Sequence, residues 1–118
     1  VCTPTRFSLL TGEYGWRTDK VGVNRSVSNG ATPLLIPTDK PTAPGLLQQA
    51  GYRTAVIGKW HLGFGLTKPD YNAELRPGPL EVGFHEYFGF PATNDRIPTV
   101  LIRDRKVLNL DPADPLVY

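Results

Sequence analysis

The sequence has 118 residues, which is enough for one domain of modest size and too few for two. Its formal net charge of +2 is close to neutral and its Lys and Arg residues are scattered, so nothing predicts a nucleic-acid partner. A single Cys excludes an internal disulfide, and the absence of a long apolar run predicts no membrane span.

The first predicted element is a short helix. Thr3 and Pro4 are typical of a helix start, because Thr can cap free backbone amides and Pro fits the first helical position. We therefore predict a helix over residues 4–11, with Cys2 at its N-terminal end. A long loop over residues 14–42 follows, and loops of this length are often functional.

A helix and a strand come next along the chain. We predict the helix over residues 42–51, capped by Thr42 and closed by Gly51. Residues 52–57 form the predicted strand, and the apolar run at 55–57 suits a buried parallel strand. This order is half of an α/β unit, whose ligands lie beyond the carboxyl ends of the strands.

The C-terminal half carries weaker patterns. Residues 69–81 are predicted to be a loop. Residues 100–103 and 106–108 flank Asp104 and Arg105, and this pattern predicts a hairpin or a pair of surface strands. Residues 111–115 are predicted to be irregular and exposed.

The residues Lys59, Trp60 and His61 directly follow the predicted strand. On an extended segment Lys59 and His61 would point to the same side, and Trp60 would pack on the other. Lys supplies a point charge for an oxyanion, and His handles protons near neutral pH. For an isolated pair of this kind, the default interpretation is an interfacial Lys and a satisfied His on a surface loop.

Cys2 is open to more than one interpretation from its local sequence. It could be a small buried apolar residue. It could also be a thiolate nucleophile, because a helix N-terminus and the nearby Arg6 both favour the anion. A nucleophilic thiolate needs a general base, and His61 could serve.

The longer string around Cys2 favours a third interpretation. Residues 2–12 (CTPTRFSLLTG) resemble the signature of the formylglycine-dependent sulfatases, in which the Cys of Cys-x-Pro-x-Arg is oxidised to formylglycine. Thr5 stands where Ser is commonest in that family. Residues 58–63 (GKWHLG) resemble the second sulfatase signature, and residues 83–95 are a weaker match to a third segment.

The resemblance implies a fold and a domain organisation. The expected fold class is α/β, as a fragment of an alkaline-phosphatase-like sandwich with a mixed sheet flanked by helices. Residues 1–118 would be one partial sulfatase catalytic domain, an internal fragment incomplete at both ends, with the resemblance running to about residue 95. Periplasmic or secreted localisation is expected by the same resemblance.

The resemblance also implies roles for individual residues. Cys2, Arg6, Lys59 and His61 would be catalytic, with Cys2 as formylglycine, Arg6 holding its oxygens and His61 contacting its hydroxyl. Lys59 would also bind a sulfate oxygen, and Thr93 would lie near the sulfate, although Thr93 could equally be a plain turn residue. His85 matches no role and is interpreted as structural.

A metal and a modifying enzyme are further implications of the family. A calcium ion, with magnesium as the alternative, would be bound by a formylglycine oxygen at Cys2 and by Asp and Asn ligands outside these residues. Cys2, His61 and His85 do not have the spacing of a zinc site. A formylglycine-generating enzyme would be a partner.

The implied activity is hydrolysis of a sulfate ester. One hydroxyl of hydrated formylglycine would attack sulfur and expel the alcohol, and sulfate would then leave as the aldehyde returns. Two alternatives stay open: a phosphonate or phosphate ester hydrolase of the same superfamily, and a non-catalytic sulfate-binding member. The 118 residues alone are expected to be inactive.

Overall fold

The computed structural model of the chain describes residues 2–19, 23 and 27–118. None of the helices in these ranges is long and apolar enough to cross a bilayer. The helices and strands of the described residues follow one another in this order: α1 (Cys2–Thr11), η1 (Gly15–Arg17), α2 (Ala43–Gln49), β1 (Ala55–Ile57), η2 (Pro79–Val82), β2 (Glu86–Gly89), β3 (Ile102–Arg103) and β4 (Lys106–Val107).

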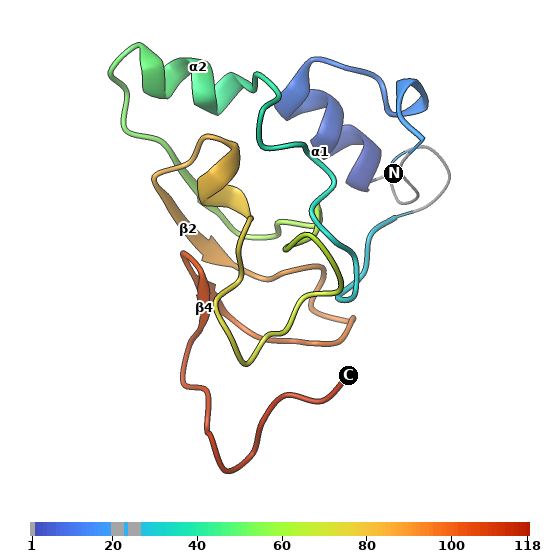
Figure 1. Cartoon of the computed structure of the whole chain (residues 1–118), viewed down its shortest axis with the longest axis vertical. Coiled ribbons are helices and arrows are strands. Elements are labelled where there is room, and N and C mark those ends of the chain that lie inside the picture. Colours follow the sequence, from blue (N-terminus) through green and yellow to red (C-terminus); the bar gives the residue numbers. More distant parts are fainter. Residues whose placement is uncertain (1, 20–22, 24–26) are drawn as a thin grey trace.

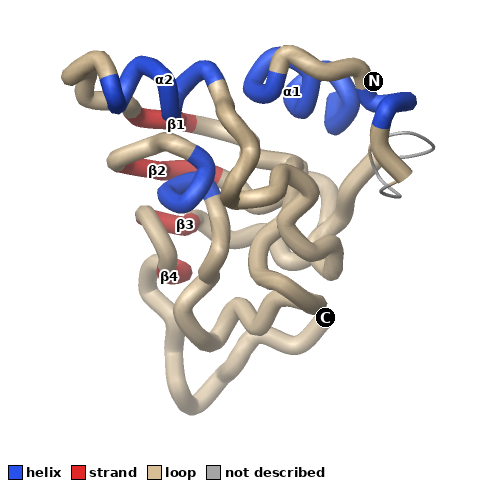
Figure 2. The backbone as a smooth tube through the Cα atoms, turned by 45° about the horizontal axis from the view of Figure 1, so that its top comes forward, coloured by secondary structure: helices blue, strands red, loops and turns tan. Residues whose placement is uncertain are grey.

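The four strands form one mixed sheet in the order β1-β2-β3-β4. β1 and β2 are parallel, with Val56 opposite Tyr87, and the other two pairs are antiparallel. Both α-helices lie toward one end of the molecule, beyond β1, and the C-terminal segment lies toward the other (Figures 1 and 2). This arrangement confirms the predicted α/β class with a mixed sheet flanked by helices.

Helix α1 begins two residues earlier than its sequence predicts. It starts at Cys2, so Thr3 lies inside the helix, where it is buried, and does not act as the N-cap. The predicted end is confirmed, because Gly12 has a φ of 72° and its amide donates to the Ser8 carbonyl at 2.9 Å. The earlier start places Cys2 itself in the first turn.

Helix α2 has the cap that its sequence predicts. The hydroxyl of Thr42 accepts a hydrogen bond from the Gly45 amide at 3.1 Å, which satisfies one of the free donors of the first turn. Ala50 is the C-cap residue, and Gly51 follows with a φ of 91°. Both ends of this helix are therefore fixed by local interactions.

Strand β1 is shorter and more exposed than predicted. It covers only residues 55–57 of the predicted 52–57, and it is parallel to β2 as expected. The expectation of burial is wrong, because the Ile57 side chain is 80% exposed. The reason is that β1 is an edge strand of the described sheet, with a hydrogen-bonded neighbour on one side only.

The C-terminal half contains two elements that the sequence patterns do not predict. The 3-10 helix η2 occupies the end of the predicted loop 69–81, and β2 lies in a segment without a predicted strand. The predicted hairpin is confirmed as β3 and β4, although both strands are shorter than expected. Residues 111–115 are irregular and exposed, as predicted.

Parts of the predicted 14–42 loop lie outside the described residues, and η1 forms within the rest.

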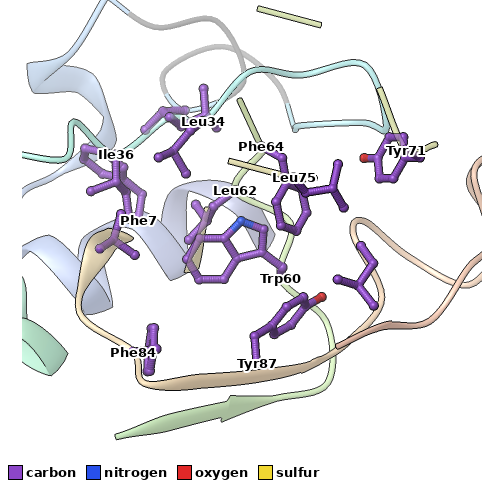
Figure 3. Close-up of a cluster of buried hydrophobic side chains, with 14 residues drawn as sticks. Phe7, Leu34, Ile36, Trp60, Leu62, Phe64, Tyr71, Leu75, Phe84 and Tyr87 are labelled. Atoms are coloured by element: carbon purple, nitrogen blue, oxygen red, sulfur yellow. The ribbon is translucent and has the colours of Figure 1, made fainter. Parts of the chain in front are cut away.

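Trp60 lies at the centre of the aromatic part of the core (Figure 3). The rings of Phe64, Phe84 and Tyr87 have centroids 6.3 to 6.4 Å from the Trp60 ring. The indole N–H of Trp60 donates to the Gly63 carbonyl at 2.7 Å, so its polar atom is satisfied. Burial of such a ring stabilises the folded protein by about 3–5 kcal/mol, which is the usual cost of truncating a buried aromatic side chain to Ala. The buried Trp60 ring therefore fixes the chain on either side of Trp60.

The segment after Trp60 lies against an early part of the chain. The amide of Leu35 donates to the Leu62 carbonyl at 2.9 Å, and the amide of Phe64 donates to the Thr32 carbonyl at 3.2 Å. Gly63 lies between these two bonds with a φ of 79°. A Cβ atom at Gly63 would lie 2.0 Å from the Pro33 carbonyl oxygen, so this contact requires glycine.

We predict that Gly63→Ala destabilises the protein by about 3 kcal/mol, the sum of the left-handed backbone cost and of overpacking. Gly51→Ala is the matched control, because Gly51 has a similar φ of 91° and a Cβ added there would meet no described atom within 4 Å. It should cost only about 1 kcal/mol. Urea unfolding measures both, and equal losses would contradict the role of the Pro33 contact.

Candidate active site

Cys2 is exposed on the first turn of α1, where free backbone amides favour negative charge. A hydrogen bond with the Lys59 side chain, followed by the Lys59 charge, lowers the pKa of the Cys2 thiol below its ordinary value. The Arg6 charge acts in the same direction. The position therefore stabilises an anionic group.

Arg6 connects α1 to the segment that follows β1. Its Nη1 atom donates to the Lys59 carbonyl at 2.6 Å, so the main chain of Lys59 is held against the helix. None of the ion pairs among the described residues involves Arg6 or Lys59. Two cations without a paired carboxylate thus lie beside Cys2, as suits an anionic ligand.

His61 is buried and has an unusual backbone conformation. Its φ is 62°, in the left-handed region that residues with a Cβ rarely adopt. Its side chain is almost fully enclosed, and its Nε2 atom lies 2.7 Å from the Ser28 carbonyl oxygen. Its Nδ1 atom is buried without a hydrogen-bond partner among the described residues. One ring nitrogen is therefore held, and within the described part of the chain the other is left available to a ligand.

Burial lowers the pKa of His61, and the Ser28 carbonyl opposes this shift only in part. The charges of Lys59, Arg96 and Arg6 act in the same direction as burial. A folded-state pKa below the usual value means that the ring becomes charged only at a lower pH than an ordinary His. The environment of His61 therefore favours the neutral imidazole over the charged form.

Thr93 lies on the loop after β2, close to Asp95 and Arg96. The interaction with the Thr93 side chain is the largest cause of the lowered pKa of Asp95. The geometry between the two side chains is nevertheless outside that of a hydrogen bond. The Thr93 hydroxyl is buried without a partner among the described residues. Arg96 donates from Nη1 to the Ser28 carbonyl at 3.2 Å, so this loop contacts the residue that holds His61.

The structure brings Cys2, Arg6 and Lys59 together, and it places His61 within electrostatic range of both cations. Trp60 packs into the core, as expected. The premise of an extended segment is wrong, because His61 is in the left-handed conformation. His85, interpreted as structural, accepts a hydrogen bond from the Thr54 amide at 3.1 Å.

Three further residues contact the site without a prediction from the sequence. Thr3 and Ser28 donate to the His61 carbonyl, and Arg96 donates to Ser28. Thr3 lies inside the first signature, and its position before Pro4 predicts a helix N-cap and no contact with His61. Ser28 and Arg96 lie in loops, whose sequences carry no periodic signal.

The described residues do not by themselves fit a metal site. They contain no group of three or more His, Cys, Asp or Glu side chains that could hold an ion. Near Cys2 the charged side chains that act on its thiol are Lys59 and Arg6, which are cations. Ligands for a metal would have to come from residues other than these.

We predict that the pH midpoint for alkylation of unmodified Cys2 by iodoacetamide lies below that of an ordinary cysteine. Lys59→Met should raise this midpoint, because it removes the hydrogen bond and the charge that favour the thiolate. Peptide mass spectrometry over a pH series measures it. Lys40→Met is the control, since Lys40 pairs with Glu13 at 2.6 Å. An unchanged midpoint in Lys59→Met would contradict the proximity of the two groups.

Comparisons with known proteins indicate the same family as the two signature segments. The family model described as Sulfatase matches residues 1–105. An N-acetylgalactosamine-6-O-sulfatase of Bacteroides thetaiotaomicron is 43% identical over 115 residues, which are 97% of this chain and 22% of that protein. Human arylsulfatase H is 38% identical over 94 residues, covering 77% of this chain and 16% of that protein.

A solved structure from a study of glycosaminoglycan metabolism by Bacteroides thetaiotaomicron superimposes with a TM-score of 0.90 at 42% identity. The match covers 98% of this chain and 23% of the solved chain. The chain thus spans about a fifth of the length of the relatives it matches. The family match covers most of the chain, and the fold of the solved structure agrees with it. The chain belongs to the sulfatase family.

Proposed function

We propose that the complete protein containing these residues hydrolyses sulfate esters, with a formylglycine formed from Cys2. The observation that carries this proposal is the pair of cations beside an exposed Cys2 in the first turn of a helix. Arg6 and Lys59 have no carboxylate partner among the described ion pairs, so their charge is available to an anionic ester. Family membership supports the same chemistry.

Formylglycine supplies, in its hydrated form, the oxygen nucleophile for sulfur. The residues of this chain orient that group and hold charge. Arg6 fixes the main chain of Lys59 while its positive charge lies near position 2. Lys59 holds a sulfate oxygen with its Nζ atom, where a preformed charge is worth most in the transition state. These two side chains are the anion-binding part of the site.

His61 and Thr93 have complementary roles in the proposal. Each has a buried polar atom without a partner among the described residues, Nδ1 in His61 and Oγ1 in Thr93. Buried polar atoms are normally satisfied, so such atoms in a site are candidates for contacts with a ligand. We assign His61 Nδ1 to proton transfer at position 2 and the Thr93 hydroxyl to a sulfate oxygen.

The proposal extends to the rest of the protein. We infer that residues 1–118 are a partial catalytic domain, because they span 22% of a relative that is 43% identical. A calcium ion, or magnesium, would then be bound mainly by ligands outside these residues. A formylglycine-generating enzyme would modify Cys2, and the protein would be periplasmic or secreted, as is expected for the family.

The substrate class is inferred from the relatives. The protein from Bacteroides thetaiotaomicron is named for N-acetylgalactosamine 6-O-sulfate, and its identity extends over nearly the whole of this chain. We therefore infer a sulfated sugar as the substrate. An aryl sulfate would serve as a generic probe, since the proposed contacts reach only the sulfate group.

One prediction of this proposal concerns the modification of Cys2. When the complete protein is expressed with a formylglycine-generating enzyme, the peptide containing Cys2 should carry oxygen in place of sulfur, with two hydrogens lost. Mass spectrometry measures this change. Arg6→Lys is the matched variant, and it should reduce the modified fraction because the Arg belongs to the recognition sequence implied by the family. Finding only unmodified thiol in the parent protein would contradict the formylglycine mechanism.

Another prediction of this proposal concerns catalysis. Lys59→Ala should lower kcat/KM for para-nitrophenyl sulfate about 100- to 1,000-fold, because one preorganised charge at the developing anion is lost. Lys40→Ala, which removes an ion pair with Glu13 that includes none of the proposed site residues, should not lower it. Release of para-nitrophenol measures both variants.

A substrate panel completes that experiment. Para-nitrophenyl phosphate and a phosphonate monoester test the sister activity, and faster turnover of either one than of the sulfate would favour the phosphate or phosphonate alternative. Equilibrium binding of sulfate without turnover would favour a non-catalytic member. The isolated 118 residues are expected to be inactive and serve as the negative control.

A further inference from the structure

The carbonyl group of His61 receives two hydroxyl hydrogen bonds. The Ser28 hydroxyl donates to it at 2.7 Å and the Thr3 hydroxyl donates at 3.1 Å. His61 has a left-handed backbone conformation, which is unfavourable for a residue with a Cβ and persists only where the surroundings enforce it. The two hydroxyl groups help to enforce this conformation, because both bind the carbonyl of the peptide group that directly follows the strained φ of His61.

Ser28 also holds the ring of the same residue. His61 Nε2 lies 2.7 Å from the Ser28 carbonyl oxygen, and a carbonyl oxygen only accepts, so Nε2 carries the hydrogen. In a neutral imidazole this leaves Nδ1 with its lone pair, and Nδ1 has no partner among the described residues. The side chain of Ser28 therefore binds the main chain of His61, while the main chain of Ser28 binds the side chain of His61.

Ser28 is itself fixed on both sides. It is almost fully buried, and its amide donates to the Thr3 hydroxyl at 3.0 Å. Its carbonyl receives Arg96 Nη1 at 3.2 Å in addition to the imidazole. All of its polar atoms thus contact residues of the site or of the loop that carries Thr93, and a movement of Ser28 would be passed on to His61.

We propose that Ser28 is a positioning residue for the reaction, which holds His61 in the orientation that leaves Nδ1 available to the reacting group at position 2. This inference rests on the proposed function. In this proposal Ser28 makes no contact of its own with the substrate. It acts through His61, and its loss should change the chemical step more than the binding of the sulfate, which belongs to Lys59.

The test uses the complete, formylglycine-containing protein with para-nitrophenyl sulfate. Ser28→Ala removes one hydrogen bond to the His61 carbonyl, and we expect kcat to fall about 10- to 100-fold with KM changed less than about twofold. Ser28→Thr keeps the hydroxyl and should recover most of the lost kcat. Mass spectrometry of the Cys2 peptide must show equal formylglycine content in all variants, so that rates are compared per modified molecule.

A matched control separates positioning from stability. Thr54 is also buried, and its hydroxyl donates to the Gly83 carbonyl at 2.7 Å, but it does not contact the site. Thr54→Val should lower the midpoint of thermal unfolding to a similar extent and leave kcat per modified molecule within about twofold. Equal losses of kcat in Thr54→Val and Ser28→Ala would show a purely structural role and overturn the proposal, as would an unchanged kcat in Ser28→Ala.

A crystal structure of each form gives a measurement that does not depend on turnover. In Ser28→Ala we expect the His61 ring to rotate away from the carbonyl of residue 28 or to lose defined density, and in Ser28→Thr we expect it to keep its place. An unmoved ring in Ser28→Ala would overturn the proposal. If the parent protein carries formylglycine and hydrolyses no sulfate ester, the proposed function fails, and the ring position still decides whether Ser28 holds His61.

Discussion

The attachment of the segment after β1 to the first turns of α1 is the constraint on which the site depends. The side chain of Arg6 binds the Lys59 carbonyl, and that of Thr3 binds the His61 carbonyl. Residues three apart on a helix share a face, so α1 presents both side chains to the same segment. Because Cys2 belongs to the same part of the helix, fixing the two carbonyls also holds the main chain of Lys59 close to Cys2.

Packing in the hydrophobic core stabilises this attachment. Trp60 lies between the two held carbonyls in the chain, and its ring is buried among aromatic side chains (Figure 3). Its indole N–H donates a hydrogen bond to the carbonyl of Gly63. Gly63 has a positive φ and packs against the Pro33 carbonyl. A buried aromatic anchor and a glycine contact therefore enclose the strained residue His61. Such strain persists where surrounding structure over-determines it, and it is concentrated at functional sites.

The electrostatic character of the site follows from this packing. Lys59 and Arg6 act on the Cys2 thiol in the direction that favours an anion, while burial and the same charges lower the pKa of His61 and so favour its neutral form. A cationic surface and a neutral base beside each other suit a reaction in which an anionic ester is held and a proton is moved. Neither property belongs to an isolated side chain. Both arise from the distances that the fold imposes.

Features that depend on neighbouring residues could be predicted from the sequence. The cap at Thr42, the helix end at Gly12 and the hairpin around residues 104–105 were predictable, because each arises from interactions within a few positions. The two signatures likewise identified the family. The edge position of β1 and the hydrogen bonds between Ser28 and His61 could not be predicted, because they depend on contacts between segments that are far apart in the sequence. A serine in a loop carries no local signal of the carbonyl group that its hydroxyl will bind.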